Sequence, residues 1–369
     1  MLRLDIRPHW QLQREAREGE PTAPALDTNA LITLLAAIQD HGAIAQAARS
    51  LGLSYRHAWG RIRDAERLFG HPLVIGGRGR GSTLSPLAEK LIWAERRVNA
   101  RLSPLLASLA SELEAEIVRT LPRPPREEPG AGPKLRLHAS HGFAVAALLE
   151  RLEAAALPVE LRYRNSVESV AALARGECDL AGFHVPIGEF EARAAAHYRQ
   201  WLRDDEHRLV HLAVRSQGLF VAAGNPLRIR SLQDLVREDV RFVNRPVGSG
   251  TRMLSELLLE AEGIQPGRLR GWNSAEFTHA AVAAYIASGM ADAGIGVQTA
   301  AQRFGLGFLP LVKERYFLAL PARLIDTPAM ARVLELLRSP GYRAAVAALA
   351  GYEAGQTGKL LTVQEAFER

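Results

Sequence analysis

The sequence of 369 residues has a single cysteine, Cys178, and no long uncharged apolar run. One cysteine excludes an internal disulfide and any zinc site built from clustered cysteines. Cys178 itself precedes a predicted strand, where we expect a buried, unreactive thiol rather than a nucleophile. A membrane-spanning helix needs about 18 such apolar residues in a row, so the sequence predicts none.

The sequence also lacks a secretory signal, because residues 1–17 alternate charged and apolar residues without an apolar core. Together with the missing disulfides this predicts a cytoplasmic protein. No nucleophile–base pair, phosphate loop or metal-ligand spacing is present. We therefore expect neither catalytic residues nor a metal site.

Residues 44–69 have the pattern of a helix-turn-helix. Two apolar-periodic stretches meet at Gly52, and Ser54 is placed to cap the second helix. Cations lie off the apolar stripe of that second helix. The alternative is an ordinary helical hairpin with a solvated basic face. The residues that we expect to contact DNA here are Ser54, Tyr55, Arg56, His57, Arg61 and Arg63.

A strand, a glycine–arginine loop and a returning strand follow over residues 72–85. This pattern predicts a wing with Arg78 and Arg80 at its tip, able to reach phosphates or the minor groove. The alternatives are a disordered surface loop or a weak phosphate cradle, although the Walker Lys-Ser/Thr ending is missing.

Positive charge is concentrated in the same region. Residues 44–101 hold 11 Lys and Arg against 4 Asp and Glu, whereas the whole chain has a net charge of +6. The rest of the protein is therefore nearly neutral, and the cationic segment suits double-stranded DNA.

These motifs carry a family resemblance. Residues 43–48, residues 53–59 with their Ser-Tyr-x-x-Ala-Trp core, and Leu84-Ser85-Pro86 resemble the winged helix-turn-helix of molybdate-responsive ModE-type regulators, and more distantly that of LysR-type regulators. The resemblance covers roughly residues 26–115. It implies that Tyr55 and Trp59 are partly structural, with Trp59 packed against the first helix rather than stacked on a base.

Residues 85–119 read as one long amphipathic helix that contains Pro104. Its apolar stripe needs a partner, and a homodimer would present two recognition helices to two half-sites. The alternative is that the helix packs on its own chain. Residues 121–133 follow, with five prolines and two glycines, and predict a linker.

The part beyond the linker alternates strand-like and helix-like stretches, which predicts an open, mostly parallel α/β sheet. Strands are expected over residues 134–139, 158–164, 179–184, 219–223, 240–243 and 291–295. One helix is expected after the first strand, through residue 156, and another after the second strand, to about residue 175. Further helices are expected over residues 251–262 and 278–288. Ligands of such sheets bind beyond the carboxyl ends of the strands.

Polar residues follow those strands or open the helices, an arrangement suited to an anion. Arg252 opposes the dipole of its own helix, so we expect something negative beside it. Serine, threonine and asparagine can instead act only as caps, and the histidines as structural residues. The residues expected to bind the ligand are Ser140, His141, Asn165, Ser166, His184, Gly248, Ser249, Gly250, Thr251, Arg252, Glu276 and His279.

A second resemblance rests on residues 245–252, 276–283 and 288–294. They resemble the type 2 periplasmic-binding-protein-like domain often described as molybdate-binding, over roughly residues 134–345. The resemblance implies a cleft between two lobes, with the chain crossing near Ser216 and returning near Phe308. We rank molybdate or tungstate first as ligand, a phosphate-bearing molybdenum cofactor second and an organic carboxylate third.

The predicted fold class is an α/β multidomain protein: a winged helix-turn-helix with a long helix, then a two-lobed ligand-sensing domain. The predicted function is a DNA-binding transcriptional regulator, not an enzyme, that acts as a homodimer or tetramer. The first alternative is an enzyme in which His141, Glu276 and His279 perform acid–base catalysis. The second is a solute-binding protein of a transporter. The predicted parts are an N-terminal extension 1–25, the winged domain 26–85, a dimerisation helix 86–120, the linker 121–133, the sensing domain 134–355 and a tail 356–369.

Overall fold

The computed structural model describes residues 4–12, 26–76, 81–120 and 134–367. The chain divides into two compact units, one of Arg7–Leu102 and the other of Met1–Ile6 with Ser103–Arg369. The predicted linker and the wing tip lie outside the described residues. Of the helices within the described ranges, none is long and apolar enough to cross a membrane.

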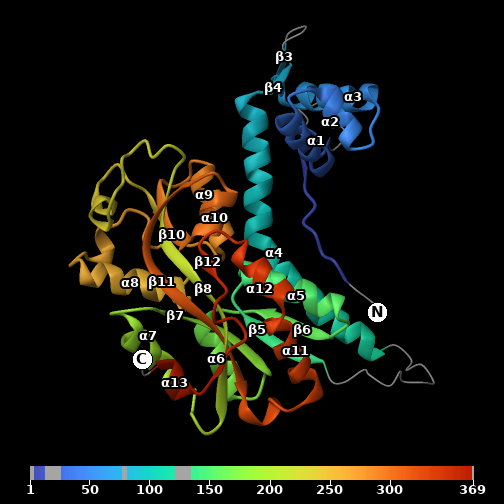
Figure 1. Cartoon of the computed structure of the whole chain (residues 1–369). Coiled ribbons are helices and arrows are strands. Elements are labelled where there is room, and N and C mark those ends of the chain that lie inside the picture. The colour runs from blue at the N-terminus through green and yellow to red at the C-terminus, as the bar shows by residue number, and fades with distance from the viewer. Residues whose placement is uncertain (1–3, 13–25, 77–80, 121–133, 368–369) are drawn as a thin grey trace. The chain divides into compact units, whose positions relative to one another are not determined.

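The smaller unit is a winged helix-turn-helix, as the sequence predicts (Figure 1). Gly52 has a φ of 67° and forms the turn, and the Ser54 hydroxyl accepts a hydrogen bond from the His57 N–H at 3.2 Å. Both predictions are thereby confirmed. Its elements are β1 (Gln11–Leu12), β2 (Leu26–Asp27), α1 (Thr28–His41), α2 (Ile44–Ser50), α3 (Tyr55–Phe69), β3 (Val74–Gly76) and β4 (Ser82–Leu84).

Small and aliphatic side chains make the core of this unit. Leu34 and Ile38 of α1 pack on Ala58 and Ile62 of α3, and all four are fully buried. Strands β3 and β4 pair antiparallel, so the two strands of the predicted wing are confirmed. The apolar stripe of α3 thus faces inward and leaves its other side to solvent.

The long helix α4 (Pro86–Thr120) confirms the predicted helix, with Pro104 inside it. The Ser85 hydroxyl caps its start. Its first half contributes Leu91 and Ile92 to the core of the smaller unit.

The second half of α4 belongs to the larger unit and packs on strand β6 (Val159–Tyr163). The hydroxyls of Ser108 and Ser111 accept hydrogen bonds from the N–H groups of Tyr163 and Leu161, at 2.9 and 3.1 Å. These bonds satisfy the outer edge of the sheet, which would otherwise be open to another strand. The alternative that α4 packs on its own chain is therefore correct for one face of the helix.

The larger unit is a two-lobed α/β domain. In the described residues its sheet has the order β6-β5-β7-β11-β8-β10-β9, with β12 and β13 pairing on β8. The strands are β5 (Leu135–Ala139), β6, β7 (Leu180–Pro186), β8 (His207–Val221), β9 (Phe242–Val243), β10 (Ala293–Val297), β11 (Gly307–Pro321), β12 (Tyr352–Glu353) and β13 (Leu360–Leu361). The helices are α5 (Phe143–Ala154), α6 (Ser166–Ala174), α7 (Glu191–Arg199), α8 (Gly250–Ala261), α9 (His279–Ala287), α10 (Gln298–Arg303), α11 (Pro328–Arg338), α12 (Pro340–Ala347) and α13 (Val363–Phe367).

The expectation of a mostly parallel sheet was wrong for the centre of this unit. Strands β5, β6 and β7 are parallel, but β8 and β11 run antiparallel along nearly their whole length and join the two lobes (Figure 1). The chain crosses near Ser216, as expected, and Ser216 pairs with Lys313. The return crossing therefore lies near Lys313 rather than near Phe308, which pairs with Phe220 inside the second lobe.

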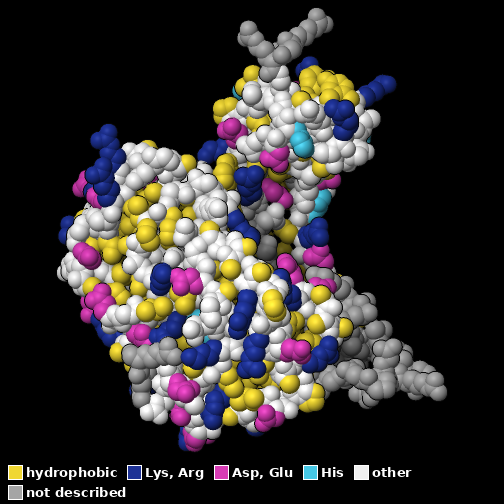
Figure 2. Space-filling view, viewed as in Figure 1, with side chains coloured by type: hydrophobic (Ala, Val, Ile, Leu, Met, Phe, Trp, Pro, Cys, Tyr) yellow, Lys and Arg dark blue, Asp and Glu magenta, His cyan; other side chains and the backbone are white. Residues whose placement is uncertain are grey.

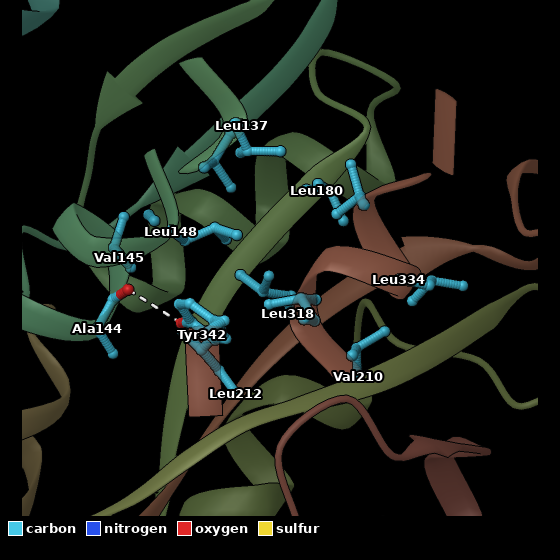
Figure 3. Packing of buried hydrophobic residues seen from close by; sticks show 14 of the residues in the cluster. Leu137, Ala144, Val145, Leu148, Leu180, Val210, Leu212, Leu318, Leu334 and Tyr342 are labelled. Carbon is cyan, nitrogen blue, oxygen red and sulfur yellow. Dashed lines mark hydrogen bonds between the residues drawn. The ribbon is translucent and has the colours of Figure 1, made fainter. Parts of the chain in front are cut away.

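Each lobe has its own core. The first lobe contains β5 to β7, α5 to α7 and α11 to α13, and the second contains β9, β10 and α8 to α10. Figure 3 shows Leu137, Leu148 and Leu318 in the first-lobe core, where the Tyr342 hydroxyl donates to the Ala144 carbonyl at 3.0 Å. Residues 356–367, which were predicted to belong to a separate tail, contribute β13 and α13 to this lobe.

We expect Tyr342→Phe to lower the free energy of unfolding by about 1 kcal/mol, because a buried carbonyl loses its side-chain donor while the core keeps its shape. Leu318→Ala, which leaves a cavity in the same core, should cost about 2–5 kcal/mol. Urea denaturation followed by circular dichroism measures both. A Tyr342→Phe protein as stable as the parent would show that this hydrogen bond contributes nothing.

Candidate functional site

The exposed side of α3 carries the cations expected to contact DNA. Arg56, His57 and Arg63 are exposed and Arg61 is partly exposed. The Arg61 Nε donates to the His57 ring at 3.0 Å, and Ser54 is occupied as the helix cap. Figure 2 shows Lys and Arg side chains beside hydrophobic ones on this unit. Arg78 and Arg80 lie outside the described residues.

The expectation that Trp59 packs against the first helix was wrong. Trp59 is 36% exposed and Tyr55 is 55% exposed, and their rings stack on the outside of α3 with centroids 6.4 Å apart. The Arg63 guanidinium lies over the Trp59 ring at 4.9 Å. The three residues are spaced by four, so they form one row along the helix, and the buried stripe beside them is filled by smaller side chains.

The larger unit contains a buried cation without a partner between its lobes. Arg245 comes two residues after β9, is 5% exposed, and its Nε and Nη1 have no hydrogen-bond partner among the described residues. Burial, and next the charge of Arg215, lower the pKa of Arg245 to about 9. A buried guanidinium in this condition is costly unless an anion joins it.

Three histidines lie close enough to this cation for its charge to lower their pKa values, and the four residues form what we name the interlobe cluster: His141, His184, Arg245 and His279. Burial, and next the charge of Arg245, lower the pKa of His141 to about 4. Burial also lowers the pKa values of His184 and His279, and the charges of Arg215 and Arg245 lower them further. All three rings are therefore neutral at pH 7, so each brings one N–H donor and one acceptor nitrogen.

The elements of the fold place these rings at the ends of strands and the starts of helices. His184 lies on β7, where its Nδ1 is 3.3 Å from the Ser166 hydroxyl and its ring packs against the Tyr316 ring, with centroids 3.8 Å apart and planes tilted by 36°. His279 is the first residue of α9, and its Nδ1 has no partner in the described part of the chain. His141 follows β5 and contacts the edge of the Tyr163 ring.

Two glycines bring the second lobe against the first. A Cβ on Gly250 would lie 3.5 Å from the Ser166 hydroxyl and from the His184 Cβ. Gly248 has a φ of 85°, and a Cβ there would lie 2.9 Å from the Asn165 amide. From the other side, the Arg303 guanidinium covers the Phe143 ring at 4.3 Å. The lobes are thus in contact around the interlobe cluster.

The remaining predicted residues have structural partners near the cluster. Asn165 caps α6 in a capping box with Glu168, Ser249 caps α8, and the Thr251 hydroxyl accepts from Gln217 at 3.0 Å. Ser140 follows β5 and is partly buried, and Glu276 is buried just before α9.

Arg252 has partners that explain it without a ligand. Its guanidinium lies 3.9 Å over the Trp272 ring and donates to Glu256 at 2.8 Å and to the Trp272 carbonyl at 3.1 Å. The Glu256 carboxylate supplies the negative charge that the position of Arg252 in the first helical turn led us to expect.

Arg245 was not among the residues expected to bind the ligand. It follows the predicted strand of residues 240–243, and an arginine at the carboxyl end of a strand in such a sheet is placed to meet a ligand. The second missed feature is the pair Arg215 and Glu314, which join β8 to β11 where the lobes meet. Gln217 donates to the same Glu314 carboxylate at 2.9 Å.

A metal is a poor match for this arrangement. Among the described residues there is no group of three or more His, Cys, Asp or Glu side chains that could hold one ion. Arg245 would also repel a cation. The chemistry that fits is the binding of a negatively charged group by N–H and O–H donors.

Comparison with known proteins agrees with both units. Residues 148–338 match the family described as PBP superfamily domain, and residues 30–89 match the family described as bacterial regulatory helix-turn-helix protein, lysR family. The uncharacterized protein YvgK of Bacillus subtilis is 32% identical over 235 residues, which is 63% of this chain and 75% of that protein. The molybdenum-pterin-binding protein MopB of Rhodobacter capsulatus is 40% identical over 97 residues, or 24% of this chain and 36% of that protein.

Solved structures also align along both units. Full-length LysG from Corynebacterium glutamicum with bound effector Arg is 17% identical, with a TM-score of 0.39, and 87% of this chain and 98% of that chain are covered. CbnR, a LysR family transcriptional regulator, is 19% identical with a TM-score of 0.38, over 83% of this chain and 98% of that chain. The assignment of the helix-turn-helix thus rests on the sequence match to the lysR family, and the ModE-type resemblance stays a prediction.

The lowered histidine pKa values predict acid lability of the ligand-free protein. The unfolded chain binds more protons than the folded chain between pH 6.5 and about 4, so stability falls as the pH drops through this window. The free energy of unfolding of the parent protein should fall between pH 7 and pH 5, and we expect this fall to be smaller by roughly 1–2 kcal/mol in His141→Asn. The exposed His197 serves as the control through His197→Asn. Urea denaturation at pH 7 and pH 5 measures the free energy of unfolding of each variant. An equal decrease in both variants would contradict the prediction.

Proposed function

We propose that this chain, which belongs to the PBP superfamily and is a DNA-binding transcriptional regulator with a lysR-type helix-turn-helix, senses a small oxyanion in its interlobe cluster. Molybdate or tungstate is the first candidate. The observation that carries the proposal is the buried guanidinium of Arg245, whose Nε and Nη1 have no hydrogen-bond partner among the described residues, near three neutral histidines. We place the protein in the cytoplasm because that is where its DNA target lies.

Charge favours an anion over a neutral ligand. Glu314 is paired with Arg215 and also accepts from Gln217, so it cannot fully compensate Arg245 as well. A bound anion would give Arg245 the partner it lacks, and the gain is large because the surroundings exclude water.

Donor type and size favour an oxyanion over a bulky molecule. The Arg245 N–H groups, the ring N–H groups of the histidines and the Ser166 hydroxyl are donors that suit a ligand made of oxygens. His184, Arg245 and His279 are each no more than 5% exposed and the lobes are in contact around them, so this site favours a compact ligand over a bulky one.

A phosphate-bearing molybdenum cofactor is the second candidate, because one relative is named a molybdenum-pterin-binding protein. The same guanidinium would bind its phosphate. The pterin, however, would need the lobes to separate around Gly248 and Gly250, whose contacts with the first lobe leave no room for a ring.

The proposed mechanism uses the two strands that join the lobes. An anion bound to Arg245 of the second lobe and to His184 of the first would favour the closed arrangement, and β8 and β11 would absorb the change. We propose that closure alters the spacing of two helix-turn-helix units in a homodimer. Half-site spacing on DNA depends on that distance.

The proposed dimer contact is the exposed apolar row on the second half of α4. Leu105, Leu109, Leu113 and Ile117 are 39–57% exposed and spaced by four residues, opposite the face that Ser108 and Ser111 pack on β6. Such a row on a helix is the kind of surface that a second helix covers.

We expect molybdate or tungstate at 100 times its dissociation constant to stabilise the protein by about 2.7 kcal/mol. Arg245→Met should abolish this stabilisation and raise the stability of the ligand-free protein, since an unpaired buried charge is removed. Arg252→Gln, the matched loss of an arginine engaged elsewhere, should keep the response. Thermal denaturation with molybdate, tungstate, sulfate and a pterin phosphate measures this, and the absence of any response in the parent protein would overturn the sensor proposal.

We expect Leu109→Glu with Leu113→Glu to halve the mass in solution toward the 40.3 kDa of one chain. Two buried charges facing each other would outweigh the apolar contact. Met290→Glu, at an equally exposed position beyond α9, should leave the mass unchanged. Light scattering after size exclusion reports the mass. If the variant remains a dimer, the interface does not include this row of α4.

A further inference from the structure

Helix α3, the recognition helix of the helix-turn-helix, carries an exposed row of two aromatic residues. DNA contacts made by the cations of α3 do not account for this row. Tyr55 and Trp59 are both large and exposed, and their ring planes differ by 7°. The core of the unit does not use them, because Ala58, Ile62 and Ala65 fill the inward stripe. An exposed aromatic pair on a small soluble unit is the mark of a contact surface.

The pair is held in one orientation before any partner arrives. The Ser54 cap makes Tyr55 the first residue of α3, and the stacked rings and the Arg63 guanidinium over Trp59 restrict both side chains. The first residues of a recognition helix are those that reach base edges in the major groove. Restricted side chains lose little entropy on binding.

The cations beside this row identify duplex DNA as the occupant. Arg56 and Arg63 are exposed next to the rings and suit phosphates. Within the major groove only one base offers an apolar group, the 5-methyl of thymine, and apolar side chains recognise it by contact. Tyrosine could also donate a hydrogen bond, but the indole ring of Trp59 is mainly apolar.

We propose that Tyr55 and Trp59 read thymine methyl groups, so that each half-site contains thymines recognised by contact rather than by hydrogen bonds. Trp59 is thereby a specificity-determining residue, alongside the arginines that bind the backbone. The row spans one helical turn of α3, and the 6.4 Å between the ring centroids is about two base-pair steps of roughly 3.4 Å, so the two rings would meet different base pairs.

The test starts from duplexes that the full-length protein selects from a random pool. Each thymine of the selected site is then replaced by deoxyuridine, which removes the methyl group and keeps base pairing. We expect the loss of one contacted methyl to weaken binding roughly fourfold, the effect of exposing about one buried methylene. Binding is measured by fluorescence anisotropy at one salt concentration, because arginine–phosphate contacts depend on salt.

The decisive quantity is the ratio of affinities for the thymine and uracil sites, in which a general weakening of a variant cancels. Trp59→Ala should bring this ratio to about one at one position of the site, and Tyr55→Ala should do so at a second position. The matched control is Trp93→Ala, because Trp93 lies on α4 and also carries an arginine over its ring, Arg96 at 5.0 Å. That variant should keep the ratio of the parent.

Two results would overturn the proposal. The first is a parent protein that binds thymine and uracil sites equally, a measurement that needs no variant to fold. The second is a Trp59→Ala protein that keeps the uracil penalty at every position, which would leave Trp59 as a support for Arg63 or as a contact with another protein.

Discussion

The arrangement of the interlobe cluster depends on one constraint: two guanidinium groups are buried near a single carboxylate, that of Glu314. Arg215 and Glu314 pair inside the protein where β8 and β11 join the lobes, and Arg245 interacts with both. Burying Arg215 and Glu314 still costs desolvation free energy, but their mutual attraction offsets much of that cost. Burying Arg245 without a partner is costly, and this cost is what a bound anion would remove.

The surrounding glycines and histidines follow from that constraint. Gly248 and Gly250 let the second lobe approach the first closely enough to exclude water from the cluster. The histidines are neutral because burial and the neighbouring arginines disfavour a further positive charge. A neutral ring still donates one hydrogen bond, so the cluster offers donors to an anion without adding cations that the fold would have to stabilise.

Helix α4 has three different surroundings along its length. Its first half packs Leu91 and Ile92 into the DNA-binding unit, and its second half seals the edge of the sheet through two serines. The same second half leaves a row of four apolar residues exposed. One helix can meet these different surroundings because residues three or four positions apart share a face, so each face can carry its own type of side chain.

The local structure could be predicted from the sequence: the helix-turn-helix, its Ser54 cap, the wing strands, the long helix and most strands of the larger unit. These features depend on residues near each other in the chain, through periodicity and capping. Other outcomes follow from long-range contacts: Trp59 points outward, Arg252 is engaged by Glu256 and Trp272, and the Arg245 Nε and Nη1 have no hydrogen-bond partner in the described part of the chain. These outcomes depend on contacts between distant segments, above all the antiparallel crossing of β8 and β11, whose register no local pattern records.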